Sequence, residues 1–146
     1  MTITVIGVGL IGGSMALELK ANNFCAHIIG VDDNIIHQNE ALKHGIVDEI
    51  GSLEYAIEKS SLIILATPVN ISSKIIVAVM DQLTTQIMFD VGSTKEQLVA
   101  LIKNHKKRAQ FVATHPIAGT EYSGPKSAHI GLFNEKVTII CDQKDS

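Results

Sequence analysis

Three glycines near the start of the chain have a spacing that suits the binding of phosphate groups. They follow the apolar residues 3–6 in the pattern G-x-G-x-x-G, as Gly7, Gly9 and Gly12. In such a turn the first glycine permits a tight bend, the second lets backbone approach a pyrophosphate, and the third lets a helix pack closely on a strand. The helix would begin at Leu10 and Ile11, where unpaired N–H groups and the positive end of the helix dipole attract phosphates.

An acidic residue stands at the end of the next apolar run. Asp32 lies 20 residues after Gly12 and directly follows the apolar residues 28–31. At this point a carboxylate can accept hydrogen bonds from the hydroxyls of an adenosine ribose. It would repel a 2′-phosphate, and the neighbouring Asp33 and Asn34 offer no positive charge to offset that repulsion. The sequence therefore predicts a dinucleotide site that prefers NAD, with a purely structural glycine turn as the alternative.

Two further loops follow apolar runs and carry residues suited to binding. Thr67 and Pro68 come directly after residues 62–65, and Ser93 lies within the Asp-Val-Gly-Ser-Thr-Lys segment 90–95. In open α/β sheets, ligands bind outside the carboxyl ends of the strands, so we expect both loops to border the cofactor. Each loop has a structural alternative, because Pro68 could set an ordinary turn and the hydroxyl of Ser93 could cap a helix.

The longest loop, residues 114–125, contains His115 and two of the three prolines of the chain. Histidine titrates near neutral pH, so His115 is the natural candidate for proton transfer, with a structural histidine as the alternative. A nicotinamide enzyme needs such a group for the proton of the alcohol that it oxidises, while the cofactor takes the hydride. We expect the other histidines to be solvated and to have no chemical role: His27, His37, His44, His105 and His129.

Apolar runs that alternate with helical patterns must position these loops. Strands are predicted over 3–6, 28–31, 46–47, 62–65, 86–89, 111–113 and 137–141, with helices after the glycine turn, over 34–43, after Ser52, and around 98–102. In a further helix, apolar residues recur every four positions and are expected to form its buried face: Ile71, Ile75, Val79 and Leu83. Continuously apolar strands separated by helices indicate an α/β fold, a doubly wound, mainly parallel sheet of the Rossmann type with helices on both faces.

The composition favours one dinucleotide-binding domain over residues 1–146. Hydrophobic residues make up 46% of the chain and the mean hydropathy is +0.25, yet no apolar run approaches the roughly 18 residues of a membrane span. We therefore attribute the apolar excess to buried strands and a docking face, and we expect no membrane partner. Because the first predicted strand begins at residue 3, we expect no signal peptide.

Charge and cysteine content restrict the partners further. The net charge of −3 argues against a nucleic-acid partner. The basic cluster at residues 103–108 is expected to form a solvated helix end, where cations complement the helix dipole. Cys25 and Cys141 have no metal-ligand spacing, so we expect no metal site and reduced thiols in a cytoplasmic protein.

Several of these segments together resemble a known family. Residues 7–14, the segment 90–95 and above all the segment His-Pro-Ile-Ala-Gly-Thr-Glu-Tyr-Ser-Gly at 115–124 are similar to the prephenate and arogenate dehydrogenases of tyrosine biosynthesis. The resemblance runs from the first strand to Phe133. It implies NAD-dependent oxidative decarboxylation of prephenate to 4-hydroxyphenylpyruvate, driven by aromatisation of the ring.

The resemblance also implies roles for three residues. His115 would be the catalytic histidine that accepts a hydrogen bond from the ring 4-hydroxyl as hydride leaves. Ser93 would contact that hydroxyl and the nicotinamide end of the cofactor, and Asp32 would bind the ribose.

The same resemblance implies a helical domain that residues 1–146 do not contain. In family members that domain dimerises and supplies cationic contacts for the substrate carboxylates, so we expect a homodimer. No arginine lies near the three loops, which leaves Lys95 and Lys126 as candidate anchors or as solvated lysines. Three alternatives stay open: an arogenate dehydrogenase, another nicotinamide oxidoreductase of the same fold, and a non-catalytic dinucleotide-sensing module.

Overall fold

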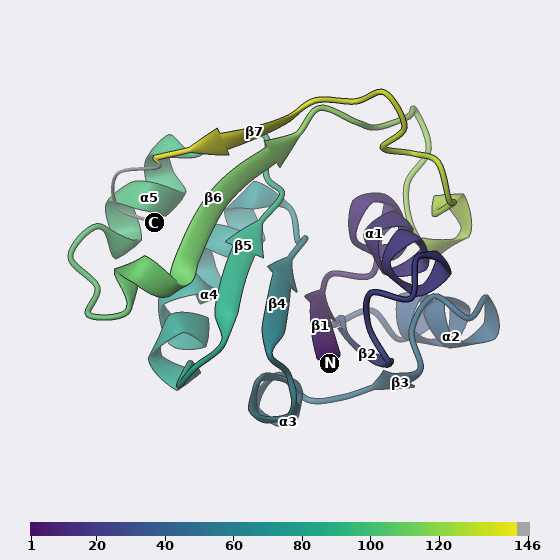
Figure 1. Ribbon diagram of the computed structural model, residues 1–146, viewed down its shortest axis with the longest axis horizontal. Coiled ribbons are helices and arrows are strands. Elements are labelled where there is room, and N and C mark those ends of the chain that lie inside the picture. Colours follow the sequence, from purple (N-terminus) through teal and green to yellow (C-terminus); the bar gives the residue numbers. More distant parts are fainter. Residues whose placement is uncertain (143–146) are drawn as a thin grey trace.

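A single sheet of seven strands, in the order β3-β2-β1-β4-β5-β6-β7, runs through the computed structural model, which describes residues 1–142 (Figure 1). The first six strands are parallel, and β7 pairs antiparallel with β6 at one edge. The chain reverses the direction of strand order between β3 and β4, so the switch point lies beside β1, as the Rossmann-type prediction requires. The strands are β1 (Thr2–Ile6), β2 (His27–Val31), β3 (Glu49–Ile50), β4 (Leu62–Leu65), β5 (Ile87–Asp90), β6 (Phe111–Pro116) and β7 (Thr138–Cys141).

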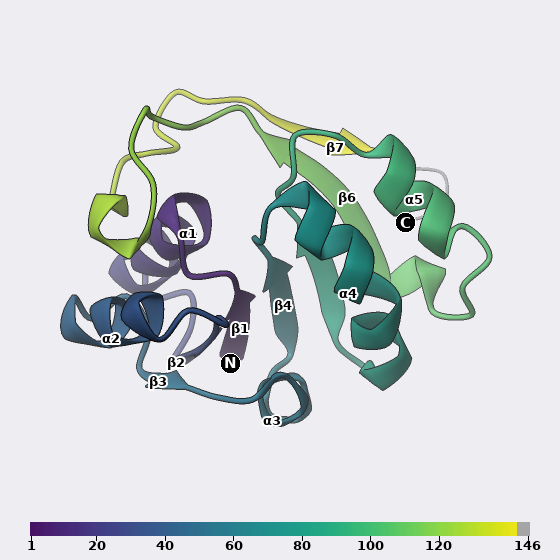
Figure 2. The same cartoon turned by 180° about the vertical axis from the view of Figure 1, so that it is seen from behind.

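Helices cover both faces of the sheet (Figures 1 and 2). Two of them begin at side-chain caps: Asn34 accepts a hydrogen bond from the N–H of Ile36 at 2.9 Å, and Ser52 accepts one from the N–H of Tyr55 at 3.3 Å. The helices are α1 (Leu10–Ala21), α2 (Ile35–Lys43), α3 (Leu53–Lys59), α4 (Val69–Gln82) and α5 (Glu96–Ile102), with single 3-10 turns η1 (Arg108–Gln110) and η2 (Pro125–Ser127).

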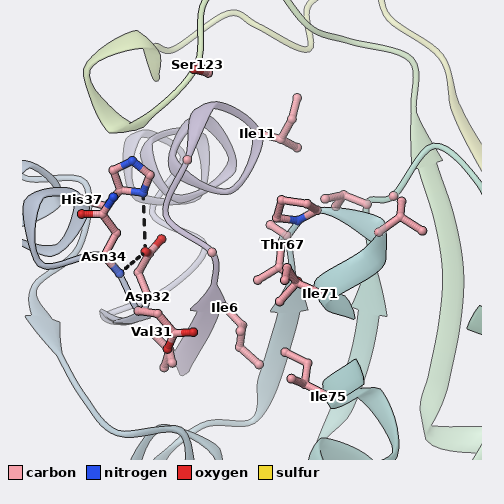
Figure 3. Close-up of a pocket in the computed structure, with 18 of the residues that line it drawn as sticks. Ile6, Ile11, Val31, Asp32, Asn34, His37, Thr67, Ile71, Ile75 and Ser123 are labelled. Atoms are coloured by element: carbon pink, nitrogen blue, oxygen red, sulfur yellow. Dashed lines mark hydrogen bonds and ion pairs between the residues drawn. The ribbon is translucent and has the colours of Figure 1, made fainter. Parts of the chain in front are cut away.

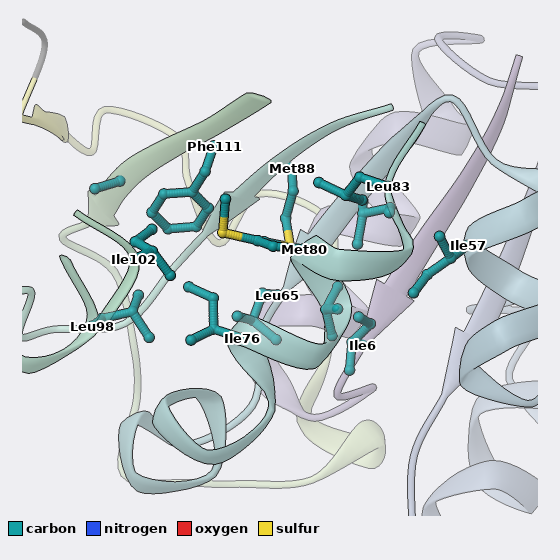
Figure 4. Close-up of a cluster of buried hydrophobic side chains, with 13 residues drawn as sticks. Ile6, Ile57, Leu65, Ile76, Met80, Leu83, Met88, Leu98, Ile102 and Phe111 are labelled. Carbon is teal, nitrogen blue, oxygen red and sulfur yellow. The ribbon is translucent and has the colours of Figure 1, made fainter. Parts of the chain in front are cut away.

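The two faces of the sheet bury two separate hydrophobic clusters, because successive strand residues point to opposite sides. In β4, Ile63 and Leu65 pack with residues of α3, α4 and α5 in a cluster that also contains the fully buried Phe111 (Figure 4). Ile64, between them, joins the cluster formed with α1 and α2. Burial on both faces explains why the central strands are apolar at nearly every position.

Two details of the predicted elements are wrong. The short third strand lies at Glu49–Ile50, whereas Ile46 and Val47 are loop residues buried in the cluster under α1 and α2. The buried face of α4 is also turned from the predicted one. It consists of Ser72, Ile76, Val79 and Met80, so the prediction is confirmed for Val79, and also for Leu83, which is fully buried just after the helix. Ile71 and Ile75 are only half-buried and line the cleft described below. Periodicity alone could not separate these faces, because apolar residues occupy both.

The basic cluster after α5 is only partly the solvated helix end that the sequence predicts, because Lys103 and Lys106 are exposed whereas Lys107 and Arg108 have structural partners. Arg108 is buried, donates to the backbone oxygen of Phe111 at 2.7 Å, and pairs with Asp142 at 2.7 Å. Lys107 donates to the backbone oxygen of Asp81 at 2.6 Å. These cations fasten the loop before β6 to α4 and to the end of β7, which is a structural role.

A long connection, residues 117–137, links β6 to β7 and is called here the crossing segment. It leaves the edge of the sheet, carries η2 to the far side against α1 and α2, and returns as β7 (Figure 1). There the N–H of His129 donates to Ser14 Oγ at 3.0 Å, and Lys126 pairs with Glu40 at 2.8 Å. The crossing segment is therefore bonded to both α1 and α2.

No helix among residues 1–142 is long and apolar enough to cross a membrane. The same residues contain no cluster of three or more histidine, cysteine or acidic side chains that could hold a metal ion. Cys25 and Cys141 are both free thiols.

Candidate functional site

The three glycines of the turn between β1 and α1 meet three different surroundings. Gly7 has a φ of +93°, and a Cβ there would lie 2.7 Å from the backbone oxygen of Ala66. A Cβ at Gly12 would lie 2.2 Å from the backbone oxygen of Gly7, so α1 packs directly on the turn. A Cβ at Gly9 would meet nothing within 4 Å. The first and third glycines are therefore required by packing, and the second faces open space.

Asp32 sits at the carboxyl end of β2 with only 13% of its side chain exposed. Its Oδ2 accepts a hydrogen bond from the N–H of Val8 at 3.1 Å, and its Oδ1 accepts one from Asn34 at 2.9 Å. One carboxylate thus joins the glycine turn to the start of α2. Both oxygens keep unused lone pairs that a ribose hydroxyl could reach from the cleft.

His37, which we expected to be solvated, lies instead beside Asp32 and lines the cleft described below. It lies on the first turn of α2, and its Nδ1 is 3.5 Å from Asp32 Oδ1 (Figure 3). The crossing segment comes close on the other side, since a Cβ at Gly124 would be 3.8 Å from His37 Nε2. The spacing of five residues after Asp32, with a helix cap at Asn34, was the available signal that this side chain turns back toward the acid.

An open cleft of about 690 Å³ lies above the carboxyl ends of β1, β2 and β4. One part is apolar and is formed by Ile6, Val31, Leu53, Ile71 and Ile75 (Figure 3). The rest carries polar groups. The cleft collects these predicted site residues: Gly7, Gly9, Ile11, Asp32, Thr67, Pro68 and Ser93.

Three predicted site residues do not line the cleft. Leu10 is buried at the start of α1, and Gly12 lies beneath the turn. His115 lies in β6, opposite Ile139 of β7, because the antiparallel pairing carries β6 on to Pro116. The predicted loop position of His115 is wrong, because pairing with β7 lengthens β6 beyond its apolar residues. The side chain of His115 is half-buried.

The loop at Thr67 and Pro68 is held from within. Thr67 Oγ1 lies 2.8 Å from Ser72 Oγ, which also donates to the backbone oxygen of Thr67 at 3.1 Å. Pro68 stands immediately before α4, where its missing N–H leaves no unpaired donor. The loop is therefore a fixed wall of the cleft opposite Asp32.

Lys95 and Lys126, the two candidate anchors, both have acidic partners. Lys95 is 13% exposed and forms an ion pair with Asp90, which is 1% exposed. Lys126 is exposed and pairs with Glu40, whose hydrogen bond and charge raise the pKa of Lys126. Neither lysine is simply solvated, and Lys95 in particular is committed to a buried carboxylate.

Comparison with known proteins decides the family. A family model described as the nucleotide-binding domain of prephenate dehydrogenase matches residues 15–146. The chain belongs to this family.

Members of the prephenate dehydrogenase family align with almost the whole chain. A prephenate dehydrogenase of Lactococcus lactis is 31% identical over 145 residues, which cover 97% of this chain and 41% of that protein. The crystal structure of prephenate dehydrogenase from Aquifex aeolicus with hydroxyphenyl propionate and NAD+ has a TM-score of 0.90 at 31% identity, covering 100% of this chain and 52% of the other. Arogenate dehydrogenase of Synechocystis has a TM-score of 0.80 at 29% identity, covering 96% and 49%. The chain spans about half the length of these relatives.

Proposed function

We propose that this chain is the NAD-binding part of an enzyme that oxidises and decarboxylates prephenate to 4-hydroxyphenylpyruvate. The observation that carries the proposal is the open space at Gly9, beside two glycines that packing requires. At Gly9 a pyrophosphate can occupy the space that the side chain of any other residue would fill. The first turn of α1 offers the pyrophosphate unpaired N–H groups. The relative from Aquifex aeolicus that was crystallised with NAD+ has the same fold over the full length of this chain.

The cleft accounts for the other parts of the cofactor. Asp32 would accept hydrogen bonds from the adenosine ribose, and the apolar part of the cleft around Ile71 and Ile75 would hold the adenine ring. Thr67, Pro68 and Ser93 line the continuation of the cleft toward β5, where the nicotinamide would lie. The carboxylate of Asp32 would repel a 2′-phosphate, which supports NAD as the cofactor.

Two residues of this chain are proposed to act on the substrate. NAD supplies a hydride acceptor when bound. His115 accepts the proton of the ring 4-hydroxyl as hydride leaves the same carbon, loss of the substrate carboxyl as carbon dioxide completes the aromatic ring as a phenolate, and the phenolate oxygen takes the proton back. Ser93, at the nicotinamide end, donates to or accepts from that hydroxyl and fixes its direction. Arogenate is the second candidate substrate, supported by the fold shared with the Synechocystis enzyme.

Measurement of NADH formation by the native gene product tests this proposal. With saturating NAD, prephenate and arogenate should each be offered, and turnover within about 1 to 10³ per second on either one identifies the substrate. No turnover on either, combined with tight NAD binding, would instead support another nicotinamide oxidoreductase or a dinucleotide sensor. Residues 1–146 alone should bind NAD but turn over prephenate negligibly, because Lys95 and Lys126 are already paired and provide no free cation for the substrate.

We also propose a cytoplasmic homodimer without nucleic-acid or membrane partners. The net charge of −3 supports the absence of a nucleic-acid partner. Apolar side chains exposed along the edge strand β7, Ile139 and Ile140, support self-association. Light scattering coupled to gel filtration should give twice the chain mass, and a monomer at all concentrations would remove the dimer from the proposal.

A further inference from the structure

We propose that Asp90 is a positioning residue that locks the Ser93 loop and the His115 strand into one arrangement, and this inference rests on the proposed function. Asp90 is the last residue of β5 and is almost completely buried. It does not line the cleft, and its neighbours do the chemistry proposed above. Its two carboxylate oxygens are divided between the two segments.

One oxygen serves the Ser93 loop. Asp90 Oδ2 accepts a hydrogen bond from the N–H of Gly92 at 2.9 Å and forms the ion pair with Lys95. These two partners stand on either side of Ser93 in the sequence. The loop is therefore closed around the carboxylate, and the position of Ser93 is set from both of its ends.

The other oxygen serves the strand that carries His115. Asp90 Oδ1 accepts a hydrogen bond from the N–H of Thr114 at 3.2 Å, and Thr114 Oγ1 donates to the backbone oxygen of Asp90. The regular pairing of β5 with β6 ends at Asp90 and Ala113. Beyond that point the backbone of β5 turns away into the loop, so the side chain of Asp90 extends the pairing by one residue to the position immediately before His115.

The charge of Asp90 makes this arrangement specific. A buried carboxylate is costly unless charged and hydrogen-bonding partners surround it, and here Lys95, Gly92 and Thr114 supply them. An asparagine has one acceptor oxygen and one donor group, so it could serve one of the two segments but not both. Asp90→Asn should therefore uncouple the two segments while changing the volume of the side chain very little.

The test uses the native gene product with prephenate, or with arogenate if that is the substrate. Asp90→Asn should lower kcat by about 10- to 100-fold, since small misplacements of reacting groups have effects of that size. The Kd for NAD should change by less than about threefold, because Asp32 and the glycine turn are separate from this network. Asp48→Asn is the matched control. Asp48 also accepts from a lysine, Lys20, and from a backbone N–H, each at 2.7 Å, but lies far from the cleft, so kcat should be unchanged.

A milder variant covers the case in which Asp90→Asn does not fold. Thr114→Val keeps the N–H donor and loses only the hydroxyl bond, and we expect kcat to fall by about three- to tenfold with unchanged NAD affinity. Lys95→Arg should retain more activity than Lys95→Met, because it preserves the charge beside Asp90. If Lys95→Met instead raises KM for the substrate with kcat intact, Lys95 is a substrate anchor and the positioning role is refuted.

Failure of this inference differs from failure of the proposed function. An active wild type with equally active Asp90→Asn and Thr114→Val variants overturns the inference alone. An inactive wild type overturns the proposed function, and the coupling is then read from the NMR signals of the His115 ring upon NAD binding. Asp90→Asn should change that response and Asp48→Asn should not, and equal responses in both variants would also overturn the inference.

Discussion

Gly9→Ala should separate cofactor binding from folding, because the structure gives the added methyl group room in the protein but none beside a bound pyrophosphate. Gly9 has φ −71° and ψ −157°, which any L-residue can adopt, and a Cβ meets no atom within 4 Å. The free energy of unfolding should therefore change by less than about 0.5 kcal/mol. The methyl group would push a phosphate away from the helix N–H groups. Loss of one hydrogen bond to a charged group, about 1.5–3 kcal/mol, corresponds to roughly 10- to 100-fold weaker NAD binding.

Gly12→Ala should instead lower the free energy of unfolding. Its Cβ would lie 2.2 Å from the backbone oxygen of Gly7 and 2.9 Å from side-chain carbons of Val5 and Ala66. These atoms belong to β1, to the turn and to the end of β4, so relief requires α1 to move off the sheet. Overpacking of a core costs typically 1–3 kcal/mol, and contact with fixed backbone places this variant at or above the upper end.

Urea unfolding followed by circular dichroism gives the stabilities, and calorimetric titration with NAD gives the affinities. Gly119→Ala is the control, because a Cβ there also meets nothing within 4 Å and Gly119 does not line the cleft. It should alter neither quantity. Wild-type NAD affinity in Gly9→Ala would mean that the pyrophosphate does not pass this residue, and wild-type stability in Gly12→Ala would refute the close packing of α1.

Three further outcomes are expected. Wild type should bind NAD at least about tenfold more tightly than its 2′-phosphorylated relative, and Asp32→Asn should reduce that ratio in calorimetric titrations because it removes the repelling charge; an unchanged ratio would assign the preference to another group. In steady-state assays of the native gene product, His115→Asn should lower kcat by about 10² to 10⁴ with NAD affinity retained, and Ser93→Ala should lower it less; near-normal turnover of the His115 variant would make that residue structural. Burial raises the pKa of Asp48, but hydrogen bonds from Lys20 and the backbone and nearby positive charge outweigh it, so the net pKa lies below its ordinary value. The carboxylate therefore contributes stability above the ordinary pKa of about 4, and this contribution is lost as pH falls through the lower folded pKa. Asp48→Asn should cost about 1 kcal/mol in urea unfolding at pH 7, since the pair is partly exposed, and a difference from wild type that persisted undiminished at the lowest pH would contradict this account.

Most of the strands and helices, and the parallel α/β fold, follow from local patterns in the sequence. Continuously apolar runs, the glycine turn and two side-chain caps each act within a few residues, so the elements can be inferred without knowing what they touch. Edges and faces were harder to infer. Ile46 and Val47 resemble a strand, yet they are loop residues that fill the core under α1 and α2, and the true face of α4 could not be chosen among equally apolar positions.

Site residues within one local motif could be predicted from the sequence. Site residues whose role depends on contact between two distant segments could not. The glycines and Asp32 form a local motif with known distances along the chain. The role of His37 depends on how α2 turns toward β2, and the bonds of Asp90 to Thr114 join residues 24 positions apart. The acceptors of Lys95 and Arg108, Asp90 and Asp142, lie 5 and 34 residues away, so the sequence left Lys95 as an anchor or a solvated lysine and made Arg108 part of a solvated helix end.

The crossing segment has a consequence for the order in which the protein is made. The glycine turn is synthesised before Ser123 and Gly124, which border the same cleft and follow it by more than a hundred residues. Domains fold during synthesis from the N-terminus onward, so the first βαβ unit can form before the crossing segment has left the ribosome. Gly131 and His129 bond to Glu18 and Ser14 of α1 across 113 and 115 residues, and closing loops of that length has a large entropy cost. We therefore expect a nascent chain released before the crossing segment to hold nucleotide weakly, and the cleft to become complete only as β7 pairs with β6.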